Sequence, residues 1–217
     1  MSERVRGAGE RLNLGTPTTP RPAASIVLLR RGGRHAQRKL EVLMLRRTDQ
    51  AHFMPGIWVF PGGSVDPGDG DGDAGFRACA VRELAEEAAI ELPPGEELVP
   101  FCRWITPEYV ATRFDAWFYL ALAPAHAPPQ PDGVEVTAAA WHTPAAALAA
   151  HEAGELPLAF PTLNQLRMLL PYRTSNEAID AYRGLNPEPV LPRVVGEGDR
   201  RRVVLPGDPA YDDQAAP

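Results

Sequence analysis

Apolar residues recur along the chain first with the period of β-strands and later with that of helices. Runs rich in apolar and β-branched side chains predict strands at residues 23–29, 40–45, 99–105, 113–122 and 134–142. Apolar side chains at helical spacing predict a central helix over residues 74–88 and later helices after Thr143-Pro144, over 162–170 and near 176–182. Strands on both sides of one central helix, followed by late helices, predict an α/β fold with a mixed β-sheet between helical layers.

The predicted central helix has two unlike faces. Its apolar stripe can pack on a sheet and consists of Val81, Leu84, Ala85 and Ala88. Its other face carries three glutamates at positions i, i+3 and i+4, namely Glu83, Glu86 and Glu87. Like charges at this spacing repel each other, and a bound divalent cation would remove the repulsion, since carboxylate oxygens are the ligands that Mg²⁺ and Mn²⁺ prefer. A solvated acidic face is the alternative.

A glycine-rich turn precedes this helix. Residues 60–63 read Phe-Pro-Gly-Gly, and residues 66–75 are nearly all Asp, Gly and Pro, which predicts a loop. Turn and helix together resemble the Nudix box of the Nudix hydrolases, written G-x5-E-x7-R-E-U-x-E-E-x-G-U, where U is a bulky apolar residue. The second half of this pattern is matched by Arg82, Glu83, Leu84, Glu86, Glu87 and Ile90.

The chain departs from the box at three points. Gly63 takes the first glycine, but Asp69 stands where the family has glutamate. Twelve residues instead of seven separate Asp69 from Arg82, and Ala89 replaces the last glycine. Extra loop length costs little, and alanine in a left-handed conformation at a helix end costs roughly 1 kcal/mol relative to glycine. None of the departures removes an expected metal ligand, so we expect an active enzyme.

The resemblance extends beyond the box. Residues 53–63, 113–115 and 205–208 are similar to the branch of Nudix proteins that contains an acyl-coenzyme A diphosphatase with an insertion in its box. The resemblance covers roughly residues 22–211 and implies the Nudix fold, a mixed β-sheet in an α/β/α sandwich. The expected organisation is a flexible N-terminal arm at residues 1–20, a Nudix hydrolase domain with C-terminal helices at 21–186, and a Pro/Gly-rich tail at 187–217 that packs on the domain.

The resemblance implies hydrolysis of a diphosphate bond with Mg²⁺ or Mn²⁺ as cofactor. It implies that the metal is held by Glu83, Glu86, Glu87 and the carbonyl oxygen of Gly63. Arg82 is expected to orient the glutamates through a bidentate contact, which makes Arg82 and Glu83 candidate catalytic residues; an ordinary helix ion pair is the alternative. The implied substrate is a nucleoside diphosphate derivative, with coenzyme A or acyl-coenzyme A as leading candidate. The alternatives are a house-cleaning pyrophosphatase for NADH or ADP-ribose and a non-catalytic nucleotide sensor.

Further candidates lie outside the box. Glu135 follows a Pro-Asp-Gly loop and lies six residues before Trp141, the usual relation in the family, so it is a candidate base or extra ligand; an exposed strand-edge glutamate is the alternative. Asp115 is expected to pair with Arg113 on one strand face, with catalysis as the alternative. Residues that are candidates for substrate contacts, with solvated charges or core packing as alternatives, are Arg46, Arg47, Phe53 and Trp58.

Composition limits the kinds of binding partner that we expect. The net charge is −6 and no block of lysine and arginine is present, so a nucleic-acid surface is not expected. The two cysteines predict reduced thiols and a cytoplasmic protein, and no apolar run reaches the roughly 18 residues of a membrane span. A small-molecule partner is therefore expected, and the late helices and the proline-rich tail are candidates for a homodimer contact.

Overall fold

The computed structural model of the protein describes residues 15–31, 39–51, 53–125, 127–196 and 202–211. Its strands are β1 (Arg21–Arg31), β2 (Leu40–Arg47), β3 (Trp58–Val59), β4 (Gly62–Ser64), β5 (Val99–Ile105), β6 (Phe114–Leu122), β7 (Val136–His142), β8 (Pro189–Val190), β9 (Arg193–Val195) and β10 (Arg202–Val204). Its helices are the short 3₁₀ helix η1 (Pro67–Asp69) and the α-helices α1 (Gly72–Ala88), α2 (Pro144–Glu152), α3 (Phe160–Leu169) and α4 (Ser175–Tyr182).

Among the described residues, eight strands form one mixed sheet, in the order β3-β2-β1-β6-β5-β8, with β4 beside β1 and β7 beside β2. β1 runs parallel to β6 and antiparallel to both β2 and β4. β2 pairs with residues 29–31 of β1, whereas β4 pairs with residues 23–25. β1 therefore changes neighbours along its length, and the glycine turn joins the sheet where β2 no longer pairs with β1.

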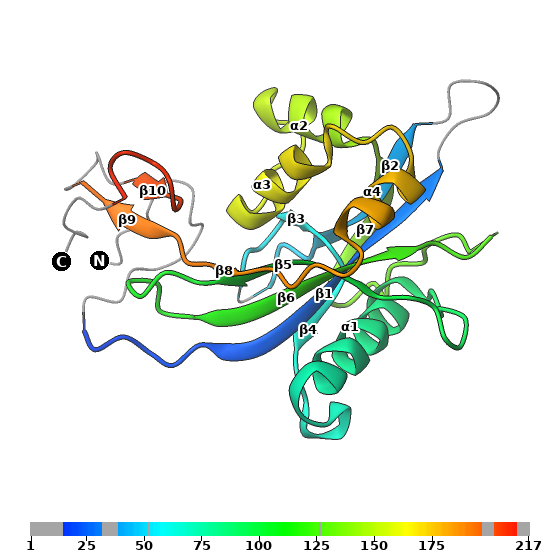
Figure 1. Ribbon diagram of the computed structural model, residues 1–217, viewed down its shortest axis with the longest axis horizontal. Helices are drawn as coiled ribbons and strands as arrows, with labels where there is room; N and C mark the ends of the chain where they lie inside the picture. The colour runs from blue at the N-terminus through cyan, green and yellow to red at the C-terminus, as the bar shows by residue number, and fades with distance from the viewer. Residues whose placement is uncertain (1–14, 32–38, 52, 126, 197–201, 212–217) are drawn as a thin grey trace.

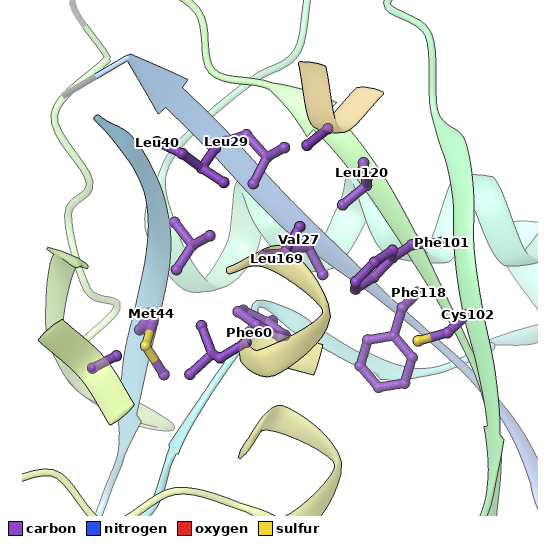
Figure 2. Close-up of a cluster of buried hydrophobic side chains, with 14 of the residues drawn as sticks. Val27, Leu29, Leu40, Met44, Phe60, Phe101, Cys102, Phe118, Leu120 and Leu169 are labelled. Carbon is purple, nitrogen blue, oxygen red and sulfur yellow. The ribbon is translucent and has the colours of Figure 1, made fainter. Parts of the chain in front are cut away.

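Helices cover both faces of this sheet, which confirms the predicted α/β/α sandwich. α1 covers one face, and α2, α3 and α4 lie on the other (Figure 1). Alternate residues of β1 point into the cores on the two opposite faces of the sheet, because side chains of a strand alternate between its faces. Ile26 and Leu28 belong to the core beneath α1. Val27 and Leu29 belong to the opposite core, where Figure 2 shows Val27 near Leu169 of α3 and Leu29 near Leu40.

The buried face of α1 is rotated from the predicted apolar stripe. Leu84 and Ala88 are buried as expected, but the other two stripe residues are only half-buried. Cys79 and Glu87 are buried as well, because the helix docks against β4. The Cys79 thiol lies 3.3 Å from the carbonyl oxygen of Ser64, and burial raises the pKa of this thiol to about 12. Cys79 therefore serves as a packing residue beneath the glycine turn.

The predicted loop of residues 66–75 is partly helical. η1 lies in its first half, and α1 begins at Gly72 rather than at residue 74. Asp69 closes η1, because its Oδ2 accepts a hydrogen bond of 2.8 Å from the backbone N–H of Asp66. The additional length between Asp69 and Arg82 therefore lies after η1, in the turn at residues 70–71 and the first turns of α1.

Both ends of the described chain are attached to the sheet. Arg113 Nη1 donates a hydrogen bond of 2.6 Å to the carbonyl oxygen of Thr18, and β8 pairs in parallel with β5. β9 and β10 form a separate two-stranded ribbon beyond β8 (Figure 1). Residues 1–14 and 212–217 lie outside the described residues, so the expected domain limits stay a prediction. No helix in the described part of the chain has the length and apolar character needed to cross a membrane.

Candidate active site

α1 and β4 bring two of the box glutamates against two glycines. The backbone N–H of Gly62 donates a hydrogen bond of 2.9 Å to Glu87 Oε2. A methyl group at Gly63 would overlap the carboxylate of Glu83, and one at Gly62 would overlap Ser25 of β1. Glycine is therefore required at both positions, since any side chain would displace either a glutamate or the neighbouring strand.

Arg82 joins the two halves of the box. Its Nε and Nη2 donate hydrogen bonds of 3.0 and 2.9 Å to the two carboxylate oxygens of Asp69. Its Nη1 donates hydrogen bonds of 2.9 Å each to Glu83 Oε1 and Glu86 Oε2. The bidentate partner is thus Asp69 and not a glutamate, which corrects the expected contact. The Arg82 hydrogen bond holds the pKa of Asp69 below its usual range, so this carboxylate stays ionised as the anchor of Arg82.

Burial raises the pKa of two of the box glutamates. Glu87 is only 4% exposed, and burial raises its pKa to about 8. The Gly62 N–H and the positive charge of Arg47 oppose this rise, whereas the negative charges of Glu83 and Glu135 increase it. Burial is also the main cause that raises the pKa of Glu83. A cation placed among these carboxylates would favour their ionised forms.

The donor set fits a hard divalent cation. Among the described residues, no three Asp, Glu, His or Cys side chains converge closely enough to form a metal centre. Arg82 Nη1 instead binds both Glu83 and Glu86, and the Gly62 N–H binds Glu87. Their oxygens nevertheless line one cavity, with the Glu83 carboxylate seated in the space that a side chain at Gly63 would fill. The metal-ligand roles of Gly63, Glu83, Glu86 and Glu87 stay predictions that this oxygen-rich chemistry supports.

Glu135 lines the same cavity from the loop before β7. The carboxylate of Asp132 shapes this loop, because it accepts hydrogen bonds from the backbone N–H groups of Val134, Glu135 and Val136 at 3.0, 3.1 and 2.8 Å. The carbonyl oxygen of Glu135 accepts a further hydrogen bond of 2.8 Å from the Thr48 N–H. Sequence reasoning missed Asp132, although an aspartate before glycine often bonds to the backbone that follows it.

Asp115 is paired differently from the expectation. Arg103 of β5 donates two hydrogen bonds to its carboxylate, at 2.8 and 2.6 Å. Arg113 lies outside β6 and donates to the carbonyl oxygens of Thr18 and Thr106 instead. The partner of Asp115 therefore comes from the neighbouring strand, where cross-strand side chains are closer than the expected partner within one strand.

The four candidate substrate residues separate into two pairs. Arg47 and Phe53 line the cavity, and Arg47 Nε donates a hydrogen bond of 3.0 Å to the carbonyl oxygen of Phe53. Arg46 and Trp58 are not among the described residues that line it. Arg46 forms an ion pair of 2.7 Å with Asp49, and the Trp58 ring packs edge-on against the last residue of β7, with ring centres 5.9 Å apart. β2 has a register shift between Arg46 and Arg47 where it pairs with β7, and of these two arginines Arg47 lines the cavity.

The cavity has a volume of about 600 Å³. Its acidic wall carries the glutamates of α1 and Glu135, and part of its lining consists of small side chains of the sheet, Ala23, Ser25 and Ala116. Much of the remaining lining is apolar and includes Trp104, Val110, Phe114, Phe160, Pro192 and Val203. Sites of roughly 300–1,000 Å³ with a few placed polar groups are typical for small organic ligands.

Known proteins are similar to this chain in sequence and in architecture. The NUDIX domain family model matches residues 19–160. The chain is 34% identical over 128 residues to the m7GpppN-mRNA hydrolase NUDT17 of Bos taurus, which covers 52% of this chain and 41% of that protein. It is 24% identical over 276 residues to the acyl-coenzyme A diphosphatase NUDT19 of Gallus gallus, covering 80% and 73%. A crystal structure of a NUDIX hydrolase from Alicyclobacillus acidocaldarius matches with a TM-score of 0.67 and 26% identity, covering 78% of this chain and 99% of that one.

A mixed sheet between helices, with an acidic helix docked against a glycine turn, places the protein in the structural class of that solved hydrolase. The family match spans most of the chain, and the protein belongs to the NUDIX domain family, as its sequence predicted. Two of its curated relatives are matched over only 22% and 41% of their own lengths. These matches therefore establish the family rather than a substrate.

Proposed function

We propose that the protein is a metal-dependent hydrolase of a diphosphate bond in a nucleoside diphosphate derivative, with coenzyme A or an acyl-coenzyme A as the leading substrate. The observation that carries this proposal is one cavity whose charged lining includes the carboxylates of Glu83, Glu86, Glu87 and Glu135 and the guanidinium group of Arg47. A diphosphate in this cavity would meet a metal held by the carboxylates as well as the Arg47 side chain. No hydrogen bond joins the terminal nitrogens of Arg47 to a described residue, which leaves them free to donate to phosphate oxygens.

In this proposal the Mg²⁺ or Mn²⁺ ligands are Glu83, Glu86, Glu87 and the carbonyl oxygen of Gly63. The bound ion supplies positive charge to the nonbridging oxygens and lowers the pKa of the attacking water. Arg82 fixes the positions of Glu83 and Glu86, and Glu135 accepts a proton from the water as general base. The water oxygen forms a bond to one phosphorus while the bridging P–O bond breaks, which yields two phosphate monoesters.

Coenzyme A leads among the substrates for two reasons. NUDT19 of Gallus gallus, which the match covers to 73% of its length, is named an acyl-coenzyme A diphosphatase. The cavity is also largely apolar away from the glutamates, which suits a ligand with a long uncharged arm. A pyrophosphatase for NADH or ADP-ribose would use the same machinery and is the second candidate. The name of the Bos taurus relative adds a methylated cap dinucleotide to the compounds worth testing.

A substrate panel tests the proposal. Purified protein with Mg²⁺ or Mn²⁺ is incubated with coenzyme A, acyl-coenzyme A esters, NADH, ADP-ribose, oxidised nucleotides and a cap dinucleotide, and phosphate monoesters are quantified. We expect turnover of the coenzyme A compounds and a loss of roughly 10³-fold or more in Glu86→Gln, because a metal ligand is removed. Glu91→Gln is the matched control, since Glu91 is exposed and does not line the cavity.

The outcomes separate the candidates. If no compound is turned over but ligands still stabilise the protein, the protein is a nucleotide sensor and not an enzyme. Full activity in Glu86→Gln would refute the metal assignment. A cytoplasmic location and a homodimer contact through the late helices and the tail are kept as proposals from the sequence, and light scattering of the purified protein tests the dimer.

A further inference from the structure

We propose that the apolar end of the cavity binds an aliphatic acyl group attached to the substrate, and that the C-terminal ribbon limits the length of this group. The C-terminal ribbon consists of residues 193–195 of β9 and 202–204 of β10. This inference rests on the proposed function, because it takes the reacting diphosphate to lie at the glutamates. It adds a binding site for a second part of the substrate and the segment that closes it.

The apolar end is open above the sheet and closed by aromatic side chains. The small residues Ala23 and Ala116 leave space on the sheet surface. Trp104 of β5 and Phe160 of α3 meet edge to face, with ring centres 6.1 Å apart, and both line the cavity. Val110 is 1% exposed and continues this wall. The result is an apolar chamber that extends from the acidic wall toward β5 and α3.

The C-terminal ribbon supplies the outer wall of this chamber. Val203 of β10 lines the cavity together with Pro192, which directly precedes β9. Val194 and Val204 are buried and anchor the ribbon from within. The Tyr211 hydroxyl donates a hydrogen bond of 2.7 Å to the carbonyl oxygen of Leu191 and ties the end of the described chain to the start of the ribbon. A segment more than 100 residues from the glutamates of α1 in sequence therefore completes the cavity.

The chemistry of this chamber favours an aliphatic group over a nucleobase. All charged side chains that line the described cavity belong to β2, the turn before η1, α1 or the loop before β7. None of the lining residues contributed by β5, β6, α3 or the ribbon is charged. The Thr106 hydroxyl at this end already accepts a hydrogen bond of 3.0 Å from the Phe114 N–H. A base would lose its hydrogen bonds to water there, whereas an alkyl chain loses none.

Binding without turnover tests the inference. Titration calorimetry in EDTA measures the affinity of the full chain for coenzyme A and for its acetyl, hexanoyl and decanoyl thioesters below their micelle concentrations. Each methylene buried in an apolar site raises affinity by about fourfold, so we expect a steep rise with chain length that stops when the chamber is full. Val203→Glu should remove most of this rise, measured within the variant as the ratio of its affinities for decanoyl-coenzyme A and for unacylated coenzyme A. Leu185→Glu is the control, because Leu185 is an exposed apolar residue that does not line the cavity.

Each result decides the inference. Affinity that does not depend on chain length overturns it, as does a full chain-length dependence in a folded Val203→Glu variant. Absence of binding by all four compounds also overturns it. If Val203→Glu does not fold, Phe160→Ala replaces it and should allow longer chains to bind, since it enlarges the chamber. Chain-length-dependent binding without hydrolysis would refute the proposed function alone, and hydrolysis with chain-independent affinity would refute this inference alone.

Discussion

The two ends of the cavity are built in different ways. At the acidic end, directional bonds join residues that are close in sequence: Arg82 binds Asp69, and Gly62 binds Glu87 at a separation of 25 residues. At the apolar end, the walls come from β5, β6, α3 and the C-terminal ribbon, and they meet through ring edges and van der Waals contacts. The contacts that fix the glutamates of α1 therefore lie within one motif, whereas the apolar end depends on long-range packing.

Gly63→Ala should break the acidic end most severely. The added methyl group would overlap the Glu83 carboxylate and push it out of position. Displacing a catalytic group by about 1 Å can cost on the order of 10²-fold, so we expect at least this loss in kcat/KM. Steady-state kinetics with the best substrate of the panel measures it. Gly68→Ala is the control, because no atom lies within 4 Å of the added methyl group; equal activity of both variants would contradict the placement of Glu83.

Glu87 should make the metal-free protein less stable as the pH rises. Its pKa is about 8 in the folded protein, above its ordinary value of 4.5, so the folded state retains a proton that the unfolded state has lost. This contribution to stability is complete below pH 4.5 and is lost as the pH rises through about 8. Between pH 6 and 9 in EDTA, we expect Tm to fall by roughly 5 °C more in wild type than in Glu87→Gln. Identical pH profiles by thermal unfolding would show that Glu87 ionises normally.

Asp132→Ala should reduce turnover by about tenfold, because the loop that positions Glu135 loses the acceptor of its backbone N–H groups. Asp132→Asn keeps an acceptor oxygen and should retain most of the activity. A role in positioning predicts a lower kcat with little change in KM, together with a shifted pH profile of kcat. Loss of activity in the asparagine variant equal to that in the alanine variant would instead indicate that the charge of Asp132 acts directly.

Ala89→Gly should give the smallest effect and the opposite sign. Ala89 ends α1 in the left-handed conformation, with φ 51° and ψ 36°, which is the case in which alanine is strained at this departure from the box. Glycine adopts this conformation without strain, so we expect stabilisation by roughly 0.5–1 kcal/mol and a rise in Tm of roughly 2 °C. Ala78→Gly, on the exposed helix interior, should destabilise by about 1 kcal/mol. A lower Tm for Ala89→Gly would refute the argument.

Sequence periodicity predicted the elements well where one pattern is continuous. The end of α1 at Ala88, the bounds of β5 and the start of α2 at Pro144, capped by the Thr143 hydroxyl, agree with the expectations. Each of these features depends on neighbouring residues, so local rules are sufficient. The sequence also identified the NUDIX family correctly, because the residues that define the family lie in one turn and one helix.

Features that need two distant segments to meet were not predictable. Helical spacing placed three glutamates in one sector, but only docking on β4 decided that Glu87 would be buried and Glu86 exposed. The strand pattern did not indicate which of Arg46 and Arg47 reaches the cavity, and β2 has a register shift between them where it pairs with β7. The partner of Asp115 lies on a neighbouring strand, and Val203 reaches the cavity from the far end of the chain. Register and tertiary packing determine these contacts.

The guanidinium of Arg82 has a consequence for the handling of the protein. It already supplies Glu83 and Glu86 with a counter-ion, so the proposed metal would bind carboxylates that are ordered without it rather than build the site from disorder. Chelators should therefore strip the enzyme without unfolding it at neutral or mildly acidic pH, and added Mg²⁺ should restore activity without refolding. A preparation that is inactive after purification would then need added metal ions rather than refolding.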